Sequence, residues 1–500
     1  MIRLREAVRK THAYRLIRAI QSRLRIWHGL AIWACAALLV APGIAQSNPK
    51  PLPHRLTLPR AVRIALARLP AVHISLHQMQ RSHEIEAVSR MAYMPHLALT
   101  GQINRATDNN LTGLLFPSML PAISGPVPLT ASAASAWGSA AGAVFSWEAY
   151  AFGRRSAAVA AARAGYRQAR ARLQLSRLRA AARASLAYLT VLAARQQWIA
   201  AKADALRWHT VVRTVNALVT EQLRPRSDLS RAQAGQVRAQ IQAAEDRRAF
   251  ERDQAQLAES LGLASARLRL SGTALERQVP HPHPIPIAKR IPGWTNQPAA
   301  RAGRHAIAAA RENARAISRR RWPSFYLLGA AYGRGSGISP RGQFRSGAVG
   351  LAPATPNWAV GASLNFSISR LFTNPPATAA ARQQVKIARA RYRQIQQQLE
   401  LAYRQSRADW QAAREVALRA PVEYQASRAD ERQTLARYRA GLASIVTVAD
   451  AEHTLAAARA TLALARLGLW RARLEMGYSR GHLLPFLSSV RHAYARRRKP

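Results

Sequence analysis

The chain has 500 residues, of which 75 are Lys or Arg and 24 are Asp or Glu, so its formal net charge is +51. Its apolar fraction of 49% is that of an ordinary folded protein, which excludes a chain that is disordered throughout. A basic excess can indicate nucleic-acid binding, but the arginines are spread along every helical run and form no recognition module. We therefore interpret them as a solvated helix surface and expect no nucleic-acid partner.

The N-terminus has the pattern of a secretory signal peptide. Residues 1–25 hold eight Lys or Arg residues, an apolar run at 30–40 follows, and small residues at 43 and 45 predict cleavage after Ala45. A membrane anchor is the alternative, but the run is shorter than the ~20 residues that a span needs. The single cysteine, Cys35, lies in this run without the leucine three residues before it that a lipoprotein signal has. Cleavage would leave a chain without disulfides or thiol metal sites.

Two helices and two strands are predicted next. Apolar residues at helical spacing indicate helices at 56–69 and 71–94, which Pro70 separates. After Pro95 the apolar period changes to two, which predicts strands on either side of a polar loop at 108–135. The residues that share a strand face are Leu97, Leu99 and Ile103, and then Ala141, Ala143, Phe145 and Trp147.

Each half of the chain then contains a long helix, a turn and a returning helix. The first long helix begins near Arg154 and is broken at Pro225, and a helical pattern resumes over 227–263. The second runs over about 378–439, roughly 95 Å at the helical rise, and returns over 448–478. Helices of this length exceed what a globular domain needs.

The second turn is marked by residues that end and begin helices. Gly441 can adopt the left-handed conformation that lets a helix stop, and Ser444 can cap the helix that returns. Inside the long helix, Pro421 lacks a backbone donor and predicts a kink or a break.

The two halves are an internal duplication. AlaArgAlaArgLeu at 169–173 recurs as AlaArgAlaArgTyr at 388–392, a shift of 388 − 169 = 219, and Asp228 lies opposite Thr447 at the same shift. Pro95 and Pro323, which precede the strands, differ by 323 − 95 = 228, nine more than 219. The loop between the strands is therefore nine residues longer in the first half than in the second. The predicted divisions are a signal peptide at 1–45, a first repeat at 46–270, a proline-rich linker at 271–298, a second repeat at 299–485 and a basic tail at 486–500.

The segment 358–368 alternates large apolar residues with small polar ones, as a membrane-barrel strand does with lipid on one side and water on the other. A sandwich core would explain the same pattern in a single strand. The predicted strands are too few to close a barrel in one chain, so they must pair with further copies.

We predict no catalytic, cofactor-binding or metal-binding residues. His281 and His283 have no third ligand nearby in the sequence and are interpreted as part of an irregular linker. The glycines at 333, 335 and 337 lack a following lysine and helix, so we interpret them as a hairpin loop and not a phosphate loop. No nucleophile and base set is recognisable, which argues against an enzyme.

Several motifs together resemble the TolC-type outer-membrane efflux proteins. They are the opening at 56–70, MetProHisLeuAlaLeuThrGly at 94–101, the helix at 154–221, ArgTyrArgAlaGlyLeuAlaSer at 437–444 and ValAlaAspAla at 448–451. The resemblance covers about 56–485 in both repeats. It implies a mainly α fold with membrane β-strands: a long helical-barrel trunk, and four strands per chain that contribute to a trimeric twelve-stranded β-barrel in outer-membrane lipid.

The resemblance also implies a function. A homotrimer of this kind, in a Gram-negative outer membrane and extending into the periplasm, meets a periplasmic adaptor and an inner-membrane pump. It is then the passive exit duct of a tripartite efflux system for small molecules or metal ions. Two alternatives stay open: an exit duct for type I protein secretion, and a periplasmic coiled-coil structural or adaptor protein without a pore.

Family positions at the helical tips map onto this sequence residue by residue. A carboxylate ring at the periplasmic entrance corresponds to Asp450 and Thr447, and an ordinary exposed residue is the alternative for Asp450. A pair that holds the tips closed corresponds to Asp228 and Tyr438, but the arginine that partners it falls at Ala443. The implied adaptor contacts are Leu223, Arg224, Pro225, Arg226 and Ser227, and Gly441, Leu442, Ala443 and Ser444.

Overall fold

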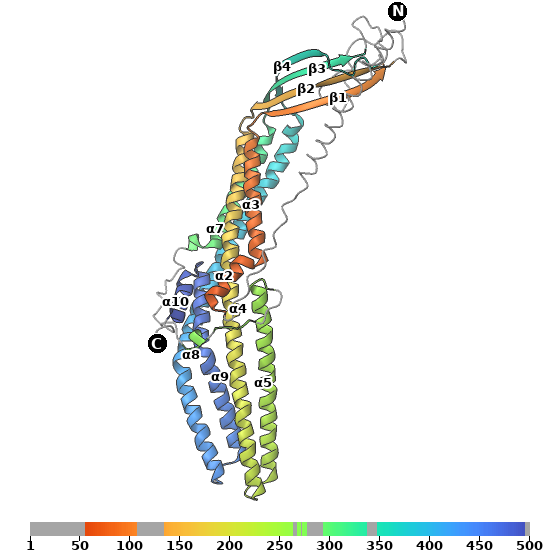
Figure 1. The fold of residues 1–500 in the computed structure, drawn as a ribbon. Coiled ribbons are helices and arrows are strands. Elements are labelled where there is room, and N and C mark those ends of the chain that lie inside the picture. The colour runs from red at the N-terminus through yellow and green to blue at the C-terminus, as the bar shows by residue number, and fades with distance from the viewer. Residues whose placement is uncertain are drawn as a thin grey trace, which may run out of the picture. The chain divides into compact units, whose positions relative to one another are not determined.

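A computed structural model describes residues 56–107, 135–263, 268–271, 273–277, 294–337 and 348–495 (Figure 1). The predicted signal peptide with Cys35, the first strand loop and the His281–His283 pair lie outside these residues. None of the described helices combines the length and apolarity that crossing a membrane requires.

Two sets of elements follow each other along the chain in the same order. The first set is α2 (Leu58–Arg68), α3 (Pro70–Met91), β1 (His96–Thr107), β2 (Ser135–Tyr150), α4 (Arg154–Thr220) and α5 (Arg226–Ser260). The connection contains α6 (Thr273–Arg277) and η1 (Trp294–Asn296). The second set is α7 (Pro298–Ser318), η2 (Arg319–Arg321), β3 (Ser324–Ser336), β4 (Thr355–Asn365), α8 (Ser369–Arg439) and α9 (Ile445–Ser479), and α10 (Leu484–Ala495) follows.

The duplication is visible in the helix boundaries. The helices α5 and α9 both have 35 residues, and their first residues differ by 445 − 226 = 219. The ends of α4 and α8 differ by 439 − 220 = 219. In Figure 1, α4 and α5 run side by side, and so do α8 and α9. The predicted pattern of long helix, turn and returning helix is therefore confirmed in both halves.

The four strands form one antiparallel sheet in the order β1-β2-β3-β4. The two inner strands come from different repeats, so the sheet joins the halves of the chain. Both edge strands expose large apolar side chains. These are Leu97, Leu99 and Ile103 on β1, and Trp358, Val360 and Leu364 on β4, which are 65% to 84% exposed.

The structure corrects three local predictions. Gly333 and Gly335 lie in β3 and not in a hairpin loop. A side chain there would collide with the carbonyl oxygens of Pro353 and Ala352, so glycine allows the two segments to approach closely.

The long helix α8 begins at Ser369 and not near 378, and it continues through its internal prolines, including Pro421. A proline removes one donor but keeps a helical φ, so the neighbouring hydrogen bonds carry the helix past it. The predicted break is therefore wrong, and the kink stays a prediction.

The largest core cluster lies where α2, α4, α9 and α10 meet. Tyr188 and Trp470 are almost completely buried in it. The Tyr188 hydroxyl donates to the Leu56 carbonyl oxygen at 2.9 Å, and the Trp470 indole donates to the Leu275 carbonyl oxygen at 3.2 Å. Since Leu275 is itself fully buried, the first residues of the predicted linker pack in this core. The limits of the repeats and the linker stay predictions.

Candidate functional site

The two helical turns at the ends of α4 and α8 have the same backbone construction. Gln222 has φ of 57° and Gly441 has φ of 82°, and these positions differ by 441 − 222 = 219. The amide of Leu223 donates to the Leu218 carbonyl oxygen at 2.9 Å, and the amide of Leu442 donates to the Arg437 carbonyl oxygen at 2.8 Å. The duplication therefore extends to individual hydrogen bonds. We call these two turns the first tip (residues 221–227) and the second tip (residues 440–444).

The helix that leaves each tip starts from an equivalent residue. Pro225 precedes α5 and Ser444 precedes α9, both with extended backbone, and 444 − 225 is again 219. The Ser444 side chain accepts from the amide of Thr447 at 3.3 Å, which confirms the predicted cap. At the first tip, proline supplies the required backbone conformation without a side-chain cap.

The structure brings together Asp228 of α5, which directly follows the first tip, and Tyr438 of α8, which precedes the second tip. The Tyr438 hydroxyl donates to the Asp228 carboxylate at 3.1 Å. Tyr438 is fully buried and Asp228 is 9% exposed, so this bond is shielded from solvent. Burial, and then the adjacent Asp228 carboxylate, raise the pKa of Tyr438 to about 12. The tyrosine therefore stays a hydrogen-bond donor at physiological pH.

Arg224 of the first tip reaches the second tip and completes this network. Its guanidinium donates to the backbone carbonyl oxygens of Tyr438 at 2.7 Å and Ala443 at 3.2 Å. The guanidinium carbon also lies 4.4 Å from the centre of the Tyr438 ring, within the range of a cation–π contact. The Asp228–Tyr438 pair thus has an arginine partner, Arg224, although the position at which the family has this arginine is Ala443 in this chain.

Sequence reasoning placed Arg224 among the adaptor contacts and did not assign it to closure. The duplication contains a signal that could have found it. Arg224 and Ala443 differ by 443 − 224 = 219, so the arginine occupies the equivalent position in the other repeat. Because the tips lie against each other, Arg224 of the first repeat reaches carbonyl groups of the second repeat.

An apolar cluster next to this network packs the helices of the two tips together. Trp208 and Val215 of α4 pack with Tyr438, Ile445 and Val448 from the second half. At Gly235 on α5, a β-carbon would lie 2.5 Å from the Trp208 ring, so only glycine lets the two helices approach here. The cluster joins helices of both repeats into one packed end.

A buried ion network also joins the repeats. The Arg207 guanidinium of α4 donates to the Glu452 carboxylate of α9 at 3.1 Å and to the Asp204 carboxylate at 2.7 Å. Glu452 is 2% exposed. Burial raises the pKa of Glu452 to about 7 against the opposing effect of Arg207, and burial also raises the pKa of Asp204. Sequence reasoning did not find this ion pair, because Arg207 and Glu452 are 245 positions apart in the chain.

The predicted entrance residues lie on the outside of the returning helix. Asp450 and Thr447 are both exposed, and the Thr447 hydroxyl donates to the Ser444 carbonyl oxygen at 2.6 Å. Leu223 and Leu442, one on each tip, are 67% and 71% exposed. Single exposed leucines at equivalent positions present an apolar contact on each tip.

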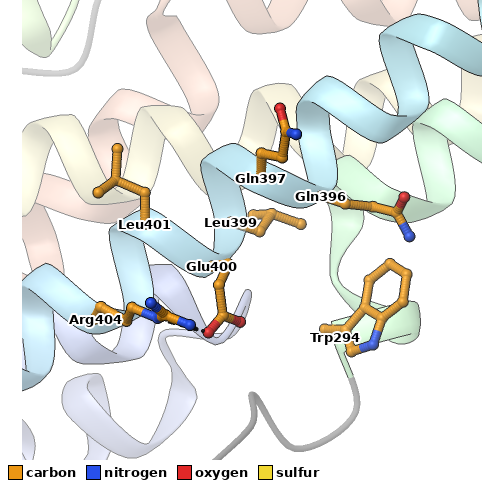
Figure 2. A pocket seen from close by; sticks show the side chains of 7 residues that line it. All are labelled: Trp294, Gln396, Gln397, Leu399, Glu400, Leu401 and Arg404. Atoms are coloured by element: carbon orange, nitrogen blue, oxygen red, sulfur yellow. Dashed lines mark hydrogen bonds and ion pairs between the residues drawn. The ribbon is translucent and has the colours of Figure 1, made fainter.

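A hollow of about 540 Å³ lies beside Trp294 and the middle of α8. Figure 2 shows Glu400 and Arg404 directed toward each other, and their side chains form an ion pair at 2.9 Å. The rest of the lining is Gln396, Gln397, Leu399 and Leu401. Amides, an already paired carboxylate and apolar groups offer no nucleophile with a base. Within the described ranges, no three or more His, Cys, Asp or Glu residues group as metal ligands would.

The family model for outer membrane efflux proteins matches residues 61–263 and 295–476, one segment for each repeat. No curated protein matches the chain in sequence. The outer-membrane channel OprN has a similar structure, with a TM-score of 0.67 and 18% identity over 85% of this chain and 89% of that chain.

VceC, an outer membrane protein of Vibrio cholerae, has a TM-score of 0.66 and 15% identity over 85% of this chain and 96% of that chain. The open state of the Neisseria gonorrhoeae channel MtrE has a TM-score of 0.65 and 20% identity over 85% and 89% of the two chains. These similarities show a shared fold, and the matched segments cover most of the chain. The protein therefore belongs to the outer membrane efflux protein family, whose members are outer-membrane channels that extend into the periplasm.

Proposed function

We propose that this protein is the exit duct of a tripartite efflux system, a passive conduit through which small molecules or metal ions leave the cell. The observation that carries the proposal is a four-stranded sheet in one chain with paired helical tips: both edge strands expose apolar side chains, and neither edge is paired within the described part of the chain. A duct needs both parts, one for the membrane and one for contact with the components that deliver cargo.

The sheet edges support assembly into a homotrimer. Among the described residues, strands β1 and β4 each have a neighbouring strand on one side only. Unpaired backbone groups are costly in lipid, so β1 of one copy must pair with β4 of the next. Three copies of a four-stranded sheet give twelve strands, an even number within the range of closed membrane barrels.

The tips supply the proposed gate and contact surface. Asp228, Tyr438 and Arg224 hold the first tip against the second, and this network keeps the periplasmic end closed. The exposed Leu223 and Leu442 lie beside it and form part of the surface for a periplasmic adaptor, which in turn contacts an inner-membrane pump.

The exposed Asp450 gives the entrance its charge. In a trimer, three such carboxylates form a ring that favours cations, whereas Thr447 contributes no charge. A ring of three charges has a weaker field than one with a second carboxylate at position 447.

Planar-bilayer conductance of the purified trimer tests the proposal. Discrete channels are expected, and Tyr438→Phe is expected to increase the open fraction because it removes the hydroxyl that binds Asp228. A correctly folded protein that never conducts, in wild type or in this variant, would instead favour a poreless periplasmic role.

Cargo is tested separately in the source cell. Deletion of the gene is expected to increase accumulation of small toxic molecules or metal ions and to leave secreted proteins unchanged. Loss of a secreted protein with unchanged accumulation would instead support type I secretion.

A further inference from the structure

A basic hollow lies where the sheet meets the helices. It has a volume of about 440 Å³, and its lining includes Arg154 at the start of α4, Arg320 of η2 and Arg370 in the first turn of α8. The Arg370 guanidinium donates to the Arg320 carbonyl oxygen at 3.4 Å, which holds these two segments together. Thr373 and Asn374 add polar groups to the same lining.

Only part of this charge is neutralised. Arg154 forms an ion pair with Glu148, and Arg155 lies 3.8 Å from the same carboxylate. Among the described residues, no carboxylate lies within ion-pair distance of Arg320 or Arg370, and both arginines are exposed. The hollow therefore has a net positive charge and donors that can bind an anion.

Aromatic side chains surround this junction. Phe152 stacks on Trp322 with ring centres 6.4 Å apart and meets the edge of Tyr150 at 4.7 Å. The Arg155 guanidinium lies 4.6 Å from the centre of the Tyr93 ring. Tyr150 is 59% exposed and Trp322 is 40% exposed. Exposed aromatic rings beside arginines are typical of the level at which a membrane protein leaves the lipid and meets water.

The first turn of α8 combines charge with apolar surface. Leu371 and Phe372 follow Arg370 directly, and they are 45% and 76% exposed. A molecule with an anionic head and an apolar chain could satisfy both at once, whereas a free anion would leave the apolar groups in water.

We propose that this hollow binds the phosphate of an anionic phospholipid headgroup from the periplasmic leaflet. Arg320 and Arg370 bind the phosphate, and Phe372 contacts the acyl chain. The proposal rests on the membrane position of the sheet that the proposed function uses, but it does not depend on the cargo or on the gate.

Lipid binding to the purified trimer in detergent tests this site. Titration with fluorescent phosphatidylglycerol should give about thirtyfold weaker binding to Arg320→Gln/Arg370→Gln, since each basic residue near an anionic lipid contributes roughly 1 kcal/mol. The matched control is Arg301→Gln/Arg304→Gln, which removes the same charge from exposed positions of α7 and should bind as the wild type does.

Two results would overturn the proposal. One is equal affinity of wild type and Arg320→Gln/Arg370→Gln for phosphatidylglycerol. The other is displacement of the lipid by millimolar inorganic phosphate, which would indicate a site for a free anion. Circular dichroism checks that the variant is folded. Conductance of the same variant keeps the two proposals apart, because the duct should still conduct when lipid binding is lost.

Discussion

The hydrogen bond between Tyr438 and Asp228 can be tested by removing one oxygen atom. Tyr438→Phe keeps the buried ring and its packing against Ile445 and Val448, and it removes only the hydroxyl that donates to Asp228 at 3.1 Å. The backbone carbonyl of Tyr438 still accepts from Arg224, so the rest of the network stays in place. The variant therefore isolates one contact between the tips.

The expected size of the effect follows from burial. Asp228 is 9% exposed, so its carboxylate loses a donor where water has little access. Leaving a buried acceptor without its partner costs about 1–3 kcal/mol, and more for a charged group. Since each 1.4 kcal/mol is a factor of ten, opening of the tips should become roughly 5- to 150-fold more frequent.

Hydrogen–deuterium exchange of the tip backbone, at residues 219–230 and 436–448, measures this opening. Exchange in both segments should accelerate in Tyr438→Phe and stay unchanged in the control Tyr424→Phe, a partly exposed tyrosine of the same helix. If the tips of Tyr438→Phe exchange at the wild-type rate, the hydrogen bond does not hold them together and the reasoning is refuted. Acceleration in Arg224→Ala alone would assign closure to the arginine.

Three further predictions concern the same end of the molecule. Gly441→Ala should lower the free energy of unfolding, measured by thermal unfolding, by about 1–2 kcal/mol, because alanine is strained at a φ of 82°; no neighbouring atom crowds a β-carbon there, so the cost comes from the backbone alone. Gln222→Gly, at a φ of 57°, should not be destabilising, and equal losses in both variants would contradict this prediction. Asp450→Ala should lower the cation preference measured from reversal potentials, and an unchanged reversal potential would exclude the ring. The Glu452 pKa of about 7 lies above its ordinary 4.5, so its contribution to stability is complete below pH 4.5 and is lost as pH rises through 7, by at most ~3 kcal/mol. Melting curves from pH 5 to 8 should show this loss of stability in wild type and in the control Glu423→Gln, which changes an exposed glutamate. The pH dependence of stability should be weaker in Glu452→Gln. If Glu452→Gln keeps the wild-type pH profile, the loss belongs to another group.

Much of the fold was predictable because its signals are local. The change from helical to alternating spacing at Pro95, the breaks at Pro70 and Pro225 and the turn at Gly441 depend only on neighbouring residues. The shift of 219 also relates the two tips to each other and predicted that they would be built alike.

Local signals were misleading where the backbone environment decided the outcome. Gly333 and Gly335 are common loop residues, but they lie in β3 because a neighbouring segment approaches too closely for a side chain. The sequence pattern predicted a later start for α8, but the helix begins at Ser369 and continues through the prolines near its start.

The sequence by itself determined the element order and the duplication, because periodicity, breakers and repeated motifs are properties of the chain, whereas the pairing of Asp228 with Tyr438 was implied by the family resemblance. Only the tertiary structure decided which other groups meet. It brought Arg224 to the carbonyl group of Ala443, Arg207 to Glu452, and Arg154 to the hollow that Arg320 and Arg370 also line. These contacts join residues 219, 245 and more than 160 positions apart, and only the packing of one repeat against the other brings them together.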